Sequence, residues 1–278
     1  MSSILTNNSA MVALETLRNV NRNLEAAQSE IATGKKVATA KDNAGIWAVA
    51  TVMSSDVESF KQISDSLSLG SSTVGVARAA SEQIVKTLQE IKSLIVTAQG
   101  ENVDRTKIAA DITAKTDLIT GFVAAAQFNG LNLIDGTSTD DVNVLSSLNR
   151  ASDGSVTAGN IVVTRQDLAT DGGLADLTSI DVSDNTNAAD ALETIETLLQ
   201  TAIDAAAAFG SAQASINSQA EFVKNLTDAL RSGVGSLTDA DMEAASAKLQ
   251  ALQVQQQLGV QALSIANQSP QALLSLFR

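Results

Sequence analysis

The sequence predicts a mainly α protein: an elongated antiparallel helical bundle or coiled coil with a small β- and loop-rich module in mid-chain. In two stretches of about forty residues, apolar side chains recur at steps of three and four. Aromatic residues make up only 3% of the 278 residues, and there is a single proline. Steps of three and four place the apolar side chains along one helix face, which favours coiled-coil packing. Such helices bury thin seams rather than a thick globular core.

The N-terminal segment, residues 1–36, is expected to form one amphipathic helix that ends at Gly34. Its apolar stripe includes four residues that we assign to assembly contacts, the last three of them at intervals of seven: Leu14, Leu17, Leu24 and Ile31. Residues 37–55 show no clean period, and we expect an ordered connector there because Pro and Gly are scarce. A long helix is then expected from about Asp56.

Residues 37–136 are expected to hold the connector and two inner helices. The longer helix runs to Gln99, with an apolar stripe from Phe60 to Ala98. After Gly100 a shorter helix covers about 108–126 and folds back antiparallel, because the intervening loop is short. Asn129 and the glycine after it form a strong turn signal.

Residues 137–187 have a different character. Helical periodicity disappears, and Gly, Asp, Ser and Thr accumulate. Residues 160–165 and 179–183 are predicted to be short strands. Eight Asp against two Arg make this stretch acidic, yet it contains no Asp-x-Asp-x-Asp-Gly calcium loop. We therefore expect a solvated surface module.

The second long stripe, residues 192–237, belongs to an inner helix assigned to 188–236. Only Gln213 and Thr227 interrupt it, and two glycines near 232–239 predict a break. Residues 237–278 are then expected to form the C-terminal helix, nested with the N-terminal one. Its assigned assembly residues are Leu249, Leu252, Leu263, Leu273 and Phe277. No charged residue occurs from Leu249 to Phe277, so we expect this helix to be buried in an assembly.

Composition excludes several classes of function. The net charge of −13 argues against nucleic acid as a partner, because phosphate binding needs clustered Lys and Arg. The chain has no His and no Cys, which removes the common zinc sites and Ser-His-Asp catalysis. We predict a non-enzyme without catalytic, cofactor or metal sites. No window of about twenty residues is apolar enough to insert into a membrane, and no cleaved signal is expected.

Four stretches resemble the bacterial flagellins. They are Ile31–Ala44 (IATGKKVATAKDNA), Ala126–Ile134 (AQFNGLNLI), Leu237–Glu243 (LTDADME) and Gln268–Arg278 (QSPQALLSLFR). They occur in the family's order and spacing. The resemblance covers about 1–136 and 188–278, and the variable middle falls outside it.

The resemblance implies a structural subunit that polymerises into the flagellar filament used for motility. It implies a homopolymer that is secreted through the flagellar type III export machinery with a chaperone. It also implies contacts with the filament cap and the hook–filament junction proteins. A hook–filament junction protein is the nearest alternative reading. A secreted protein with amphipathic helices on a membrane surface is a third, although such helices usually carry Lys and Arg.

The resemblance also implies a receptor-like surface on the inner helices. In flagellins that activate the flagellin-sensing Toll-like receptor, the contact motif is similar to residues 88–94. The family's contacting arginine corresponds to Glu90, its leucine to Leu94, and its glutamate on the next helix to Asp111. Because Glu90 reverses the charge of the arginine, we expect this chain to be a poor receptor agonist.

Overall fold

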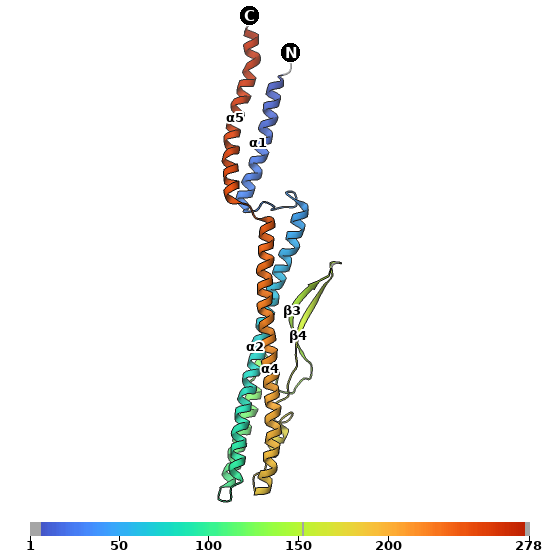
Figure 1. Cartoon of the computed structure of the whole chain (residues 1–278), viewed down its shortest axis with the longest axis vertical. Coiled ribbons are helices and arrows are strands. Elements are labelled where there is room, and N and C mark those ends of the chain that lie inside the picture. Colours follow the sequence, from blue (N-terminus) through green and yellow to red (C-terminus); the bar gives the residue numbers. More distant parts are fainter. Residues whose placement is uncertain (1–6, 152, 276–278) are drawn as a thin grey trace. The chain divides into compact units, whose positions relative to one another are not determined.

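The computed structural model describes residues 7–151 and 153–275, with side chains as far as residue 268. The helices are α1 (Asn8–Thr33), α2 (Ala44–Ala98), α3 (Arg105–Ala125), α4 (Asn185–Thr238) and α5 (Met242–Ser275), with a short 3-10 helix η1 (Ala175–Ser179). The strands are β1 (Gln127–Phe128), β2 (Leu131–Asn132), β3 (Val142–Arg150) and β4 (Val156–Val163). The predicted mainly α class with a small β-containing middle is confirmed (Figure 1).

The chain divides into two compact units. The terminal unit contains residues 1–57 and 228–278, and the inner unit contains residues 58–227. In the terminal unit α1 packs on α5, and in the inner unit α2 packs on α4. Hydrogen bonds join Asn7 to Ala266 and Asn21 to Gln256, so α1 and α5 run antiparallel.

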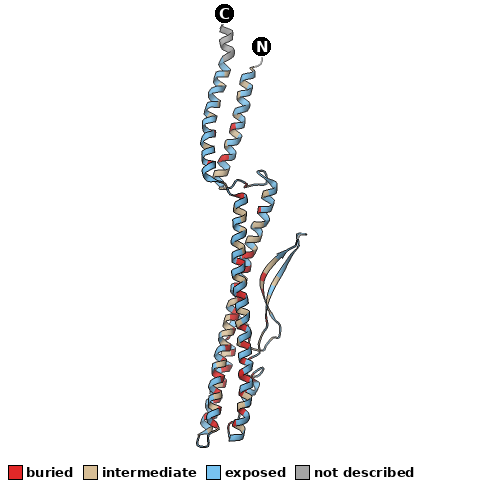
Figure 2. Ribbon diagram, viewed as in Figure 1, coloured by how far each residue is buried: buried red, intermediate tan, exposed pale blue. Residues whose placement is uncertain are grey.

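The predicted stripe of α2 is the buried face of that helix. The side chains of Ile63, Leu67, Ile84, Leu88, Ile91 and Ile95 are all 0% exposed. The opposing stripe of α4 is buried over most of its length, including Ile195, Ala202, Phe209, Ile216 and Val223. Red residues recur along both helices in Figure 2. α3 closes the inner unit by burying Ile108, Ile112 and Ile119.

The connector is shorter than predicted. α2 begins at Ala44 rather than near Asp56, because Asn43 caps it: the Ile46 amide donates to Asn43 Oδ1 at 3.1 Å. The capping residue is visible in the sequence, but the weak apolar period after it hid the helix. The shortened connector is hydrogen-bonded to the C-terminal end of α4. The amides of Lys36 and Val37 both donate to the Thr238 carbonyl.

The predicted break is present but lies at the very end of the range 232–239, since residues 239–241 separate the two helices. α4 continues to Thr238, and α5 starts after Asp241, whose carboxylate accepts from the amides of Glu243 and Ala244. Gly233 lies within the helix, where an added Cβ would be 3.1 Å from Met53 Cε. The missing side chain of Gly233 permits the close approach of Met53 and does not end the helix.

Two hairpins follow α3. Asn129 (φ 50°) and Gly130 (φ 82°) form the two-residue turn between β1 and β2, as predicted. The strand predicted at 160–165 is present as β4, although it begins earlier and ends at Val163. Its antiparallel partner β3 was not predicted, because Ser and Asn break the alternation of β3. Residues 179–183 are not a strand, since η1 runs to Ser179 and the Asp181 carboxylate then accepts from the Ser183 amide.

Candidate functional site

The facing surfaces of α1 and α5 form a thin seam. Val20, Ala27 and Leu252 are buried together, with Leu24 and Leu249 packed against them. Leu17, Ile31 and Leu263 are half-buried on the same stripes. Within one chain these α1 and α5 residues pack against the other helix. Their assignment to assembly contacts stays a prediction. Leu273 and Phe277 lie outside the residues whose side chains are described.

A second set of apolar side chains lies outside this seam. Leu14, predicted to be in the seam, is 38% exposed, and Ala13 takes the inward position. On the same two helices, six large apolar side chains outside the seam are more than half exposed: Met11, Val12, Val254, Leu258, Val260 and Ile265. The two-helix pair therefore leaves large apolar side chains of both helices uncovered. Exposed faces of this kind mark interaction sites.

Each of the two helices also has a shallow hollow on its surface. Side chains of α1 enclose a hollow of about 470 Å³ lined by Met11, Leu14, Glu15, Arg18, Asn19 and Arg22. A second hollow of about 340 Å³ on α5 is lined by Gln256, Gln257, Val260 and Gln261. The hollow on α1 combines the apolar side chains of Met11 and Leu14 with charged groups. The hollow on α5 combines Val260 with three glutamines.

The net charge is divided unequally between the units. Residues 1–57 and 228–278 contain eight Lys and Arg against nine Asp and Glu, a net charge of −1. Residues 58–227 contain ten against twenty-two, a net charge of −12. The terminal helices thus carry almost none of the repulsion that like-charged copies would experience on close approach.

The mid-chain module is only partly a surface feature. β3 docks in the inner unit through Val144, whose side chain fills the space left by Gly70 of α2, and Gln219 Nε2 donates to the Ser146 carbonyl at 2.9 Å. Residues 165–183, which we call the strap, then return along α3. The amides of Gln166 and Leu168 donate to the carbonyls of Leu133 and Ile134, both at 2.9 Å.

The strap contributes to the core of the inner unit. Four of its apolar side chains are at most 2% exposed: Leu168, Leu174, Leu177 and Val182. Glycines let it fold tightly, since a Cβ on Gly173 would lie 1.9 Å from the Asp167 carbonyl oxygen. The prediction of a solvated module is wrong for this half, because composition concealed four buried apolar residues among Asp and Gly.

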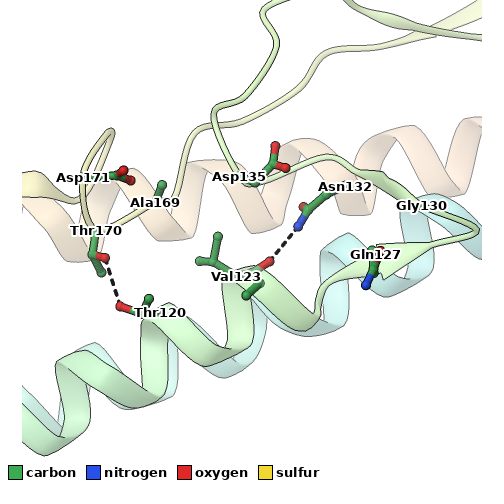
Figure 3. Close-up of a pocket in the computed structure, with 10 residues that line it drawn as sticks. Thr120, Val123, Gln127, Gly130, Asn132, Asp135, Ala169, Thr170 and Asp171 are labelled. Carbon is green, nitrogen blue, oxygen red and sulfur yellow. Dashed lines mark hydrogen bonds between the residues drawn. The ribbon is translucent and has the colours of Figure 1, made fainter.

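A hollow of about 360 Å³ lies between α3, the β1–β2 turn and the strap (Figure 3). Thr120 and Thr170 join their hydroxyls across it at 2.9 Å. The Asn132 amide nitrogen donates to the Val123 carbonyl at 2.7 Å, and its oxygen accepts from the Ile134 amide at 2.9 Å. Every buried side-chain polar atom of the described residues has a partner. The polar groups of the hollow hold the fold together.

The receptor-like residues lie on the surface of the inner unit. Lys115 of α3 binds Glu90 of α2, with 2.5 Å between Lys115 Nζ and Glu90 Oε2. Asp111 is exposed on α3, and Leu94 is half-buried on α2. Sequence reasoning placed Glu90 on an outer face but did not find its partner. A second ion pair, between Lys92 and Glu196 at 2.6 Å, joins α2 to α4.

Three aspartates have lowered pKa values because they accept hydrogen bonds in local turns. The amide and hydroxyl of Thr39 and the amide of Ala38 lower the pKa of Asp42. Ser183 and Asn187 lower the pKa of Asp181, and Ser155 lowers that of Asp153. The described residues contain no group of three His, Cys, Asp or Glu placed to hold a metal ion. In the same part of the chain, no helix is long and apolar enough to cross a membrane.

Comparison with known proteins decides the family. The model of the bacterial flagellin N-terminal helical region matches residues 4–139, and that of the C-terminal helical region matches residues 192–277. A flagellin of Brucella melitensis biotype 1 is 42% identical over the full length of both chains. The chain belongs to the bacterial flagellin family. It is a structural subunit of the flagellar filament.

Other relatives agree with this assignment. Flagellin FljM of Caulobacter vibrioides is 41% identical to this flagellin, over 100% of this chain and 99% of the relative. A putative flagellar hook-associated protein from Vibrio parahaemolyticus has a TM-score of 0.54 over 71% of this chain and 100% of its own, at 12% identity. At that identity the likeness shows a shared fold alone. Neither family model covers residues 140–191, which hold β3, β4 and the strap.

Proposed function

We propose that this flagellin polymerises through the outward apolar face of its terminal helices, so that α1 and α5 of neighbouring copies form the filament core. The observation that carries the proposal is the exposed apolar set on helices whose own seam is already paired. Leu258 and Ile265 are 57% and 69% exposed on a helix without charge after Lys248. Contact between copies removes this surface from water, which stabilises the assembly by about 25 cal/mol per Å² of apolar area buried.

We further propose the division of labour expected from the family. Residues 1–36 and 237–278 form the core, 37–136 and 188–236 the surrounding shell, and 137–187 the outward module. The unequal charge supports this order, since the nearly neutral unit packs closely while the unit of charge −12 remains hydrated. A chain without charge from Leu249 to Phe277 also fits poorly on an anionic membrane surface.

The remaining partners are proposed from the family alone. The unfolded chain passes through the flagellar type III export machinery, and a chaperone covers the C-terminal helix before export. The filament cap receives the subunit at the growing end, and hook–filament junction proteins contact the first subunits. Val254 and Leu258 are more than half exposed, and exposed apolar side chains promote aggregation. A chaperone bound to the C-terminal helix would cover them until assembly.

A pair of matched substitutions tests the core. Leu258→Asp places a carboxylate in the proposed contact, while Leu118→Asp makes the same change on α3 at a similar exposure of 53%. Burying an unpaired carboxylate costs several kcal/mol at every contact. We expect Leu258→Asp to remain folded but to form no filaments in sedimentation and negative-stain microscopy, and Leu118→Asp to polymerise. Normal filaments from Leu258→Asp would rule out this face as the core contact.

A further inference from the structure

The register of α1 against α5 is not fixed by apolar burial. Both stripes repeat at steps of three and four, and α5 offers no charged residue after Lys248 to mark a position. Sliding one helix by seven residues keeps an apolar stripe opposite an apolar stripe. In coiled coils such degeneracy is removed by a polar residue in the seam, which specifies one register at some cost in stability.

A polar pair of this kind crosses the seam. Gln256 Nε2 donates to Asn21 Oδ1 at 2.8 Å, and both residues are half-buried. Near it, Leu17 packs against Gly259, where an added Cβ would lie 3.1 Å from Leu17 Cδ1. We propose that the Asn21–Gln256 amide pair, together with the notch at Gly259, fixes the register of the terminal helices.

Displacement by one heptad breaks both features. Asn21 would then face Leu249 or Leu263, and neither side chain can accept or donate a hydrogen bond. Leu17 would face Leu252, where two large side chains compete for one space, or Ala266, where a gap remains. The observed register alone pairs the amides and places the largest side chain opposite the smallest.

This inference deepens the proposed function and depends on it for its biological meaning. In the observed register, Met11 and Ile265 are each six residues beyond the Leu17–Gly259 contact and so lie level along the pair. Both are more than half exposed. A slipped pair would present these outward side chains out of step, and every copy in a polymer must present the same face. The register thus determines which surface the next copy meets.

Engineered cysteines can report the register, because the natural chain contains none. The pair L24C/L252C joins two residues of one buried cluster in the observed register. The pairs L24C/A245C and V20C/L263C join positions that meet only after a slip of one heptad in either direction. A short thiol cross-linker is applied to the soluble chain and to assembled material, and intrachain products are counted by mass spectrometry.

Three backgrounds separate the amide pair from general effects. N21L/Q256L removes both amides, N21Q/Q256N exchanges them, and N23L/Q255L makes the same residue changes at exposed neighbouring positions. We expect the slipped-to-native ratio to rise about fivefold in N21L/Q256L, since one net hydrogen bond corresponds to about that factor in an equilibrium constant. The exchanged and control variants should keep the native ratio.

Each outcome has a distinct meaning. Native-only cross-linking in N21L/Q256L would overturn the proposal that the amides set the register, and so would equal slippage in N23L/Q255L. No L24C/L252C product in either form of the unmodified background would overturn the helix pair itself. A soluble chain that cross-links in the native register but never polymerises would refute the proposed function while leaving the register inference intact.

Discussion

The two units bury the same kind of stripe to different depths. In the inner unit α2 is covered by α3 and α4, and six of its large apolar side chains are completely inaccessible to water. In the terminal unit the described residues of α1 and α5 pack against each other as a pair, and Leu17, Leu24, Leu249 and Leu263 remain half-buried. The two units have the same sequence period, so the difference shows that a third helix decides whether a seam becomes a closed core. The open seam leaves surface for a second copy.

Breaking the closed core should have the largest effect. Ile91 is 0% exposed on α2, and Ile91→Asp buries a carboxylate without a partner, which we expect to cost more than about 4 kcal/mol and to unfold the inner unit. Circular dichroism during heating should show loss of most helicity. Ile265→Asp, at 69% exposed on α5, provides the contrast, since it should leave the melting temperature unchanged. Equal destabilisation by the two changes would contradict the comparison.

Dividing the mid-chain module gives the next effect. Replacing the strap, residues 165–183, by a Gly/Ser bridge removes four buried side chains and uncovers Leu133 and Ile134, so thermal stability of the inner unit should drop sharply. Shortening only the hairpin tip, residues 150–155, should cost little, because its described residues 150, 151 and 153–155 are exposed. Differential scanning calorimetry of both variants decides the matter. A stable strapless chain would show that residues 165–183 are a mere surface loop.

These outcomes also show how far the sequence could predict the structure. The stripes of α2, α4 and α5 follow from steps of three and four, because periodicity reports which face is buried. Leu14 is exposed although it belongs to the predicted stripe, because either Ala13 or Leu14 satisfies the spacing before Leu17. Its assignment to assembly contacts stays a prediction. The strap was missed because isolated leucines among Asp and Gly carry no period. Partners such as Lys115 for Glu90 depend on how helices pack, which one stripe cannot specify.

A smaller effect is expected at the Glu90–Lys115 pair. Because both ends reach solvent, Glu90→Arg should change the free energy of unfolding by about 1 kcal/mol or less. On the family resemblance, we predict that it also partly restores activation of the flagellin-sensing receptor by soluble protein. The variant E90R/K115E reverses the pair and separates stability from recognition. Strong activation by the unmodified chain in a receptor reporter assay would reject the prediction.

The smallest effect concerns acid. The lowered pKa of Asp42 means that its carboxylate stabilises the turn at 38–42 above its ordinary pKa of 3.8, and that this stabilisation is lost as the pH falls through the lower folded-state pKa. Amide exchange of Ala38 and Thr39 should therefore accelerate in acid. In Asp42→Asn, which keeps an acceptor oxygen but cannot titrate, that acceleration should be absent. Equal acid sensitivity in the two proteins would assign the effect to other carboxylates.

The pairing of α1 with α5 imposes an order in time as well as in space. The bonds that join them connect residues 235 and 259 positions apart, so almost the whole chain must be present before the first helix meets its partner. Contacts of such long range close late, because the loop entropy is lost before any contact compensates for it. A chain of which only the first part is available for folding can form α2 and α3. Its α1 then has no α5 to cover its apolar stripe. The first helix to appear is thus among the last to find its place, and a truncated chain lacking α5 never offers the paired surface to a neighbour.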